Sequence, residues 1–201
     1  MSALHRIFAL GTVAALTIGG AKETIAADPT GEIVGTITAS VAKHRANTVI
    51  YVKNAGLGVS TATVRMDQKG MIFSPRVLPI QKGTTVEFLN SDPVGHNVFT
   101  PDGDKYDLGT WPQGEVRKYQ FKNPGVFRQL CKVHDDMVAF IVVVDSKHFA
   151  VSDKAGEFKL PQLPPGKYTL AVWHEKLAAK EVTVEVTAGK ATKIDFALDK
   201  K

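Results

Sequence analysis

The sequence predicts an all-β protein made of two β-sandwiches. Three observations favour this class: short segments with strand patterns recur, turn-forming residues separate them, and no helical period stands out beyond the N-terminal region. At 201 residues, the chain has room for one domain or two small ones. Hydrophobic residues make up 44% of it, which is enough for a packed core.

The predicted strands are short runs of alternating or continuous apolar residues bounded by turn residues. They lie at 31–39, 47–53, 83–90, 115–121, 125–131, 139–144 and 166–174. We expect the last two strands, 180–186 and 191–198, to form a hairpin through the turn TAGK. In this hairpin, Val182, Val184 and Val186 share one face because side chains alternate along a strand.

The first 27 residues have the pattern of an export signal. His5 and Arg6 precede an apolar run, and small residues follow, with cleavage expected after Ala21 or Ala27. The run is too short and too rich in glycine to favour a membrane span, and we expect none later. Cleavage lowers the net charge by one, from +5, and the lysines are dispersed, so nucleic-acid binding is not expected. We therefore expect an exported, periplasmic protein.

The chain has a single cysteine, Cys131, which cannot form an internal disulfide. His134 and Met137 follow it at intervals of three residues, in a short loop between two predicted strands. His96 lies in another turn, NSDPVGHNVF, after the strand at 83–90. If both loops lie at the same end of a sandwich, a thiolate, two imidazoles and a thioether meet.

This ligand set is typical of a blue-copper centre, in which one thiolate and two histidines bind copper with a weak methionine ligand. Such a site holds one ion that alternates between Cu(I) and Cu(II). Zinc is the alternative, bound by Cys131, His96, His134 and either Asp135 or Asp136. The methionine argues against zinc. The remaining candidates are interpreted as core, surface or packing residues: Met66, Met71, His44, His148 and His174.

The segments MIFSPRVLPIQKGTTVEFLNSDPVGHNVF and GVFRQLCKVHDDMVAFIVVV resemble a cupredoxin of the plastocyanin and amicyanin type, over about 65–145. The whole chain resembles exported proteins labelled methylamine utilization proteins. The resemblance implies a Greek-key cupredoxin sandwich. It also implies a ligand set, His96, Cys131, His134 and Met137. Asn97 matches the asparagine that joins the two ligand loops in cupredoxins, where it acts behind the ligands.

The ligand loop departs from the amicyanin pattern, which has prolines where this chain has Lys132-Val133 and Asp135-Asp136. In the family, an apolar patch around the loop histidine contacts the redox partner. Asp135 and Asp136 would make that surface acidic. We therefore expect docking to a partner with basic residues, and electron-transfer rates that fall as salt rises.

The tail resembles a different module, the carboxypeptidase regulatory-like sandwich, which is immunoglobulin-like or transthyretin-like. Its sequence is FAVSDKAGEFKLPQLPPGKYTLAVWHE, followed by the last two strands. That module normally starts with strands like those at 31–39 and 49–53. We therefore predict a discontinuous domain, 31–53 with 147–199, and a cupredoxin at 60–146 inserted into it. The alternative gives 31–53 to the cupredoxin. The second sandwich is expected to be a scaffold or docking module.

The sequence thus predicts a periplasmic blue-copper protein, not an enzyme, that carries single electrons between redox partners. The donor and acceptor are unidentified redox proteins, with a cytochrome c or a periplasmic dehydrogenase as candidates. A copper carrier or storage protein without a redox partner is the alternative. An oxidising or reducing enzyme would need an open coordination position or a second metal cluster. A purely structural module would leave the Cys131, His96 and Met137 set unexplained.

Overall fold

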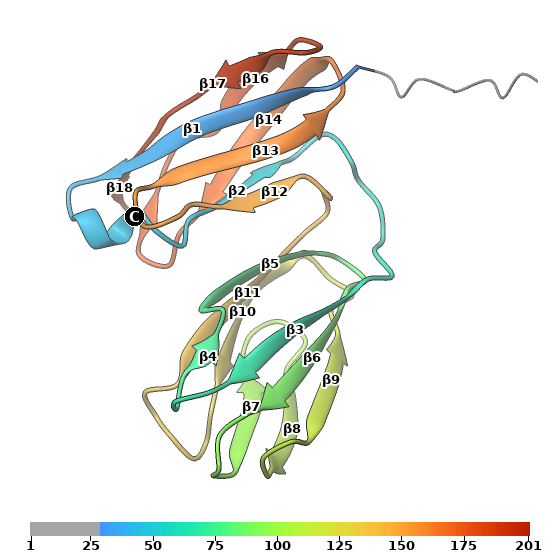
Figure 1. Ribbon diagram of the computed structural model, residues 1–201, viewed down its shortest axis with the longest axis vertical. Helices are drawn as coiled ribbons and strands as arrows, with labels where there is room; N and C mark the ends of the chain where they lie inside the picture. Colours follow the sequence, from blue (N-terminus) through green and yellow to red (C-terminus); the bar gives the residue numbers. More distant parts are fainter. Residues whose placement is uncertain (1–28) are drawn as a thin grey trace, which may run out of the picture.

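The computed structural model describes residues 29–201. The predicted export signal at 1–27 lies outside the described residues. The predicted all-β class is confirmed, since the one described helix is the 3-10 turn η1 (Ala42–His44). Two β-sandwiches are stacked along the long axis of the molecule (Figure 1). No helix in the described part of the chain is long and apolar enough to cross a membrane.

The first sandwich, here called the flanking sandwich, uses strands from both ends of the described chain. One sheet has the order β13 (Glu157–Leu163), β1 (Gly31–Ala39), β18 (Phe196–Lys200), β15 (Leu177–Ala178), and β17 (Ala191–Lys193) also pairs with β1. The other sheet has the order β12 (Phe149–Val151), β2 (Val49–Val52), β14 (Gly166–Trp173), β16 (Val182–Val186). Because β2 pairs with β12 and β14, strands from before and after residues 60–146 share one sheet.

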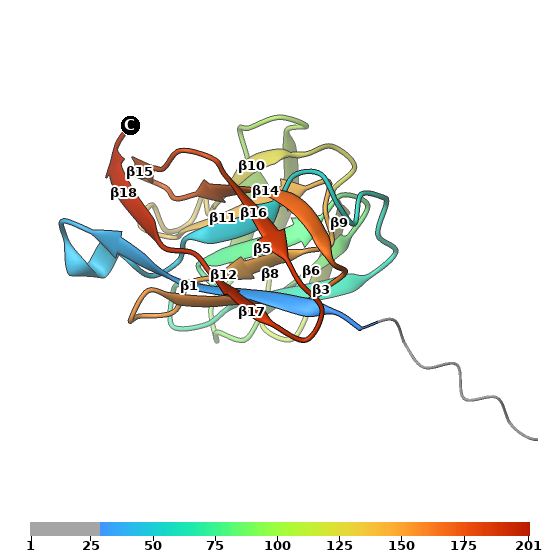
Figure 2. The ribbon, with the colours of Figure 1, turned by 90° about the horizontal axis from the view of Figure 1, so that it is seen from above.

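The predicted hairpin between 180–186 and 191–198 is wrong. β16 pairs antiparallel with β14, whereas β17 and β18 pair parallel with β1 in the opposite sheet. The view from above shows β17 running beside β1 (Figure 2). The chain between β17 and β18 approaches β1 closely at Gly35, where a Cβ atom would lie 1.6 Å from the carbonyl oxygen of Ile194. Only glycine allows this approach of the two backbones.

The second sandwich, here called the inserted sandwich, is formed by strands of residues 63–144. Its larger sheet has the order β5 (Val77–Gln81), β11 (Val138–Val144), β10 (Gly125–Leu130), β7 (His96–Thr100), β8 (Tyr106–Trp111). Its smaller sheet has the order β4 (Phe73–Ser74), β3 (Thr63–Gln68), β6 (Thr85–Asn90), β9 (Val116–Gln120). The antiparallel pairs β10–β11 and β10–β7 bring the ends of three strands together at one end of this sandwich.

Each sandwich has its own apolar core, because alternating side chains of both sheets point inward. Ile33, Ile37 and Leu170 are fully buried in the flanking core. Met66, Phe88 and Ile141 are fully buried in the inserted core, so the prediction that Met66 is a core residue is confirmed.

The two sandwiches pack against each other through a third apolar cluster, here called the interface cluster. β2 supplies Val49, and β11 supplies Val142 and Val144 to it. The rings of Phe140 and Trp173, one from each sandwich, have centroids 5.2 Å apart. This contact fixes the orientation of the inserted sandwich and places the start of β11 beside the flanking sandwich.

An arginine at the edge of this interface joins the two sandwiches by polar contacts. Arg76 forms an ion pair of 2.7 Å with Glu175 of the flanking sandwich. Its guanidinium also donates to the carbonyl of Val138 (3.1 Å) and lies over the ring of Phe140. Val138 directly follows Met137, so the flanking sandwich contacts the strand that leaves the ligand loop.

Candidate metal centre

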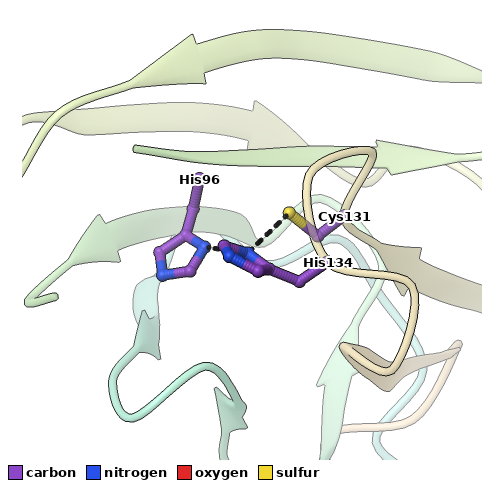
Figure 3. Close-up of side chains that lie close together, drawn as sticks. All are labelled: His96, Cys131 and His134. Atoms are coloured by element: carbon purple, nitrogen blue, oxygen red, sulfur yellow. Dashed lines mark hydrogen bonds between the residues drawn. The ribbon is translucent and has the colours of Figure 1, made fainter. Parts of the chain in front are cut away.

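Three side chains from two distant parts of the sequence converge at one end of the inserted sandwich (Figure 3). His96 is the first residue of β7, Cys131 directly follows β10, and His134 lies in the loop that leads to β11. One potential ligand atom from each of the three residues lies within 4.8 Å of the other two. The strand pairing of β10 with both β7 and β11 produces this convergence.

The ring nitrogens and the sulfur are spaced as ligands of one ion would be. The Nδ1 atoms of His96 and His134 are 3.1 Å apart, and Cys131 Sγ is 4.0 Å from His134 Nδ1. Protein nitrogen and sulfur ligands lie at about 2.0 Å and about 2.3 Å from a transition metal such as zinc, so both separations can span one ion. The residues present therefore fit a metal with one thiolate and two imidazole ligands.

Asp92 orients His96 from behind. Its Oδ2 lies 2.8 Å from Nε2 of His96, and it also accepts the N–H groups of Gly70 and Met71 at 2.6 and 2.8 Å. The two backbone N–H bonds, together with His96, lower the pKa of Asp92 to about 2. An ionised carboxylate only accepts hydrogen bonds, so Nε2 of His96 carries the proton and the Nδ1 lone pair faces His134.

Asn97 joins the two ligand segments. Its backbone N–H donates to Cys131 Sγ at 3.4 Å, and its side-chain Oδ1 accepts the N–H of Lys132 at 3.3 Å. Its Nδ2 donates to Asp107 at 2.7 Å and to the carbonyl of Gly109 at 2.9 Å. These bonds hold the start of β7 against the residues that follow β10, which fixes the distance from His96 to Cys131.

Burial differs among the predicted ligands. His96 is 0% exposed and Cys131 is 4% exposed, whereas His134 is half-buried. Met137 is buried in the same apolar cluster as Cys131, and its N–H donates to the carbonyl of His134 at 3.1 Å. His134 is therefore the group through which the centre reaches the surface.

The neighbours of His134 in the ligand loop are exposed. Asp135 and Asp136 lie at the surface of the ligand loop, and Val133 is 50% exposed. Lys132 forms an ion pair of 2.5 Å with Asp107. The sequence interpretation missed the contributions of Asp92 and Asp107. For Asp92, a signal was present, because a carboxylate four residues before a candidate ligand can turn back to its ring.

The prediction that Met71 is a core residue is wrong. Met71 has a φ of 57° in the turn between β3 and β4, and its side chain is 56% exposed. Its N–H is committed to Asp92, so the backbone of this turn supports His96 while the thioether points to solvent. Of the other interpreted histidines, His174 is buried and His44 is half-buried beside it.

Two protein-family models match this chain. Residues 60–144 match the copper binding proteins of the plastocyanin/azurin family. Residues 138–199 match the carboxypeptidase regulatory-like domain. The second match begins with β11 of the inserted sandwich, continues through the later strands of the flanking sandwich, and leaves out β1 and β2.

Solved structures with detectable similarity include a copper-containing nitrite reductase from Thermus scotoductus SA-01. It is 27% identical, with 46% of this chain and 25% of that chain covered and a TM-score of 0.40. This chain therefore spans about a quarter of the length of the nitrite reductase. A purple cupredoxin from Nitrosopumilus maritimus is 24% identical over 40% of this chain and 98% of its own, with a TM-score of 0.37. A reduced amicyanin mutant is 18% identical over 47% of this chain and 97% of its own, with a TM-score of 0.39.

The family models agree with the resemblance read from the sequence. The two matches overlap at residues 138–144, which form β11 of the inserted sandwich. The His96, Cys131 and His134 set lies within the first match. Residues 60–144 thus form a domain of the plastocyanin/azurin family of copper binding proteins, joined in one chain to a carboxypeptidase regulatory-like domain.

Proposed function

We propose that this protein is a periplasmic carrier of single electrons with one blue (type 1) copper ion, held by His96, Cys131, His134 and Met137. The observation that supports this most directly is the convergence of a buried thiol and two imidazoles within 4.8 Å. One-electron transfer suits such a set because thiolate sulfur favours Cu(I) and imidazole suits both oxidation states. The proposed periplasmic location follows from the export signal expected at 1–27.

A bound copper ion would supply reversible Cu(I)/Cu(II) chemistry, and the protein's part is to keep the ligands still. Asp92 keeps the proton of His96 on Nε2, so Nδ1 remains a ligand. Asn97 donates its N–H to the sulfur of Cys131, which stabilises a thiolate there. Asn97 joins the two ligand segments to each other. The ligands can therefore hold copper in either oxidation state with little rearrangement of their own positions.

The surface around His134 suits contact with another protein. Exposed apolar side chains come from the turns next to the site, and they are Met71, Ile72, Val94 and Val133. Exposed apolar side chains on loops that supply or support the ligands favour an interaction surface there. The proposed partners are redox proteins that donate and accept the electron through His134, and the acidic pair Asp135 and Asp136 favours partners with basic surfaces.

The test is to add Cu(II) to the purified mature protein and record its visible spectrum. An intense blue colour is expected from the copper–thiolate bond, and Cys131→Ser should abolish it. His148→Gln, which changes a histidine outside the site, is the matched control and should keep the colour. A colourless complex of the unmodified protein would contradict the proposal and favour a zinc or non-blue site.

Exchange kinetics separate electron transfer from the alternative of copper carriage. A carrier releases copper readily to a competing chelator, whereas an electron-transfer centre retains it through repeated oxidation and reduction. The buried Cys131 and His96 favour slow release. Rapid loss of copper to a chelator, with no reversible potential, would point to the carrier function instead.

A further inference from the structure

A polar cavity of about 200 Å³ lies at the seam between the two sandwiches, outside the metal centre. The inserted sandwich contributes Arg76 and Val77 to its wall. The flanking sandwich contributes Lys43 and His44 from η1, and the loop after β14. The cavity is therefore built by both domains and depends on their packing.

His174, the first residue after β14, brings an imidazole N–H donor to this cavity. It is 4% exposed, and its Nδ1 accepts the backbone N–H groups of Lys176 and Leu177 at 3.2 and 3.1 Å. In the neutral ring, the proton is consequently on Nε2. Within residues 29–201, that N–H makes no hydrogen bond, although His174 lines the cavity. Nε2 is not among the fully buried polar atoms that lack a partner, so a ligand in the cavity can reach this N–H.

The charges around the cavity are predominantly positive. Three cationic side chains, Lys43, Arg76 and Lys176, line it, and Glu175 is the one acidic residue among the described lining residues. With both histidines neutral, the lining thus carries a formal charge of +2. Glu175 pairs with Arg76 at 2.7 Å and lies 3.8 Å from Lys176, which leaves Lys43 without an acidic partner in the described chain.

Two histidines, His44 and His174, lie side by side at the cavity. The rings of His44 and His174 have centroids 5.6 Å apart. Burial lowers the pKa of His174; Glu175 opposes this, and His44, Lys201 and Lys176 lower the pKa further. A neutral His174 beside several cations presents an N–H donor in a positive field. The N–H donor and the positive charge of the lining both disfavour binding of a metal cation in this cavity and favour binding of an anion.

We propose that this cavity binds a small dianionic oxyanion of the phosphate class. Lys43 and Lys176 would supply charge, and the Nε2–H of His174 would donate to an anion oxygen. The bound anion would contact residues of both sandwiches and so stabilise their packing, by an amount that grows with its concentration. This site is independent of the metal centre and does not rest on the proposed electron transfer.

The experiment is isothermal titration of inorganic phosphate into the copper-free mature protein, in a zwitterionic buffer at low salt. One saturable site per chain is expected. Lys43→Gln combined with Lys176→Gln should weaken binding about tenfold, the equivalent of two exposed charge interactions. Lys154→Gln combined with Lys190→Gln removes the same charge from exposed lysines that do not line the cavity, and should leave the affinity within about twofold.

His174→Asn tests the imidazole donor, because the Asn Oδ1 can still accept the backbone N–H groups while the Nε2 donor is lost. It should weaken phosphate binding without unfolding the loop, as monitored by the fluorescence of the neighbouring Trp173. Acetate, a monoanion, should bind more weakly than phosphate. The proposal is overturned if no saturable binding occurs, if the control pair of lysines weakens binding as much as the cavity pair, or if acetate binds equally well.

Discussion

The carboxylate of Asp92 and the imidazole of His96 lie 2.8 Å apart, both buried and four residues apart in the chain. The carboxylate determines which ring nitrogen of His96 is free for a metal. It also anchors the turn after β3 through Gly70 and Met71. One side chain thus sets the chemical state of a ligand and the position of a neighbouring loop.

Asp92→Asn should lower the Cu(II) affinity by about tenfold to a hundredfold, the usual cost of losing a hydrogen-bond partner of a metal-binding histidine. The amide removes a negative charge near the ion, so the reduction potential should also rise. Competition with a chelator measures the first effect and voltammetry the second. Asp104→Asn, an exposed change in the same domain, is the control. Equal affinities in wild type and Asp92→Asn would show that the contact does not orient His96.

Asn97→Ala should destabilise the copper-free protein by about 1–3 kcal/mol, because it removes three hydrogen bonds by which this buried side chain joins β7 to β8 and to the ligand loop. The side chain bonds to Asp107, Gly109 and Lys132 are all lost. Urea unfolding measures the change. Asn54→Ala removes a similar number of bonds from an exposed site in the flanking sandwich and should cost less. A smaller effect for Asn97 than for Asn54 would contradict the linking role.

The lowered pKa of Asp107 predicts that the folded protein loses stability in acid. The ion pair with Lys132, followed by the bonds from Asn97 and Gly109, lowers its pKa from 3.8 to about 2. A carboxyl whose pKa is lower in the folded state stabilises the protein above the unfolded pKa. This contribution is lost as the pH falls from about 4 to about 2.

The unfolding free energy of the copper-free protein should therefore fall more steeply over this range than that of Asp107→Asn. Because the carboxylate is 41% exposed, the difference should stay below about 1 kcal/mol and shrink with added salt. Urea unfolding at a series of pH values measures it. Parallel curves for the two proteins would count against a stabilising Asp107–Lys132 pair.

Phe140→Ala should weaken the packing of the two sandwiches by about 2 kcal/mol, since the half-buried ring contacts Trp173. Trp111 reports the inserted core and Trp173 the interface, so single-tryptophan variants follow the two regions separately. Their urea transitions should coincide in wild type and separate in Phe140→Ala. Val116→Ala, exposed and outside the interface cluster, should leave them coincident. Coincidence in both variants would show that Phe140 does not couple the domains.

Asp135→Asn combined with Asp136→Asn should change the rates of electron exchange of the copper-loaded protein in opposite directions with oppositely charged reagents. Oxidation by a cationic ruthenium complex should slow and oxidation by ferricyanide should speed up at low salt, because the local negative charge is gone. Glu157→Gln with Asp199→Asn removes two exposed charges from the flanking sandwich and is the control. Rates that do not depend on salt or on the variant would contradict an acidic docking surface.

Much of the fold was predictable because alternation is a local signal. The strand predicted at 31–39 has the bounds of β1, and those at 125–131 and 166–174 end within one residue of β10 and β14. The hairpin prediction failed for a physical reason. Alternation shows which face of a strand is buried, and the faces of β16 and β18 reach the same core from opposite sheets. Strand neighbours depend on contacts that a local pattern does not contain.

In the candidate metal centre, the ligands could also be predicted from the local sequence, whereas the contacts that support them could not. The thiol, the imidazoles and their spacing mark the ligand loop, because these residue types are scarce in this chain. The contact of Asp92 with His96 and of Asp107 with Lys132 depends on how the turns fold back. Met71 was misassigned because its left-handed backbone, which directs the thioether outward, is not visible in the composition of the turn.

The pairing of β2 with β12 has a consequence for how the chain reaches its native state. Tyr51 lies opposite Phe149, and the N–H of Val52 donates to His148, so the whole inserted sandwich occupies the turn of a single antiparallel hairpin. Closing so long a loop from a random coil costs much conformational entropy. Prior folding of residues 60–146 brings the two strands together and removes most of that cost. Assembly should therefore begin with the segment in the middle of the chain and finish with its two ends.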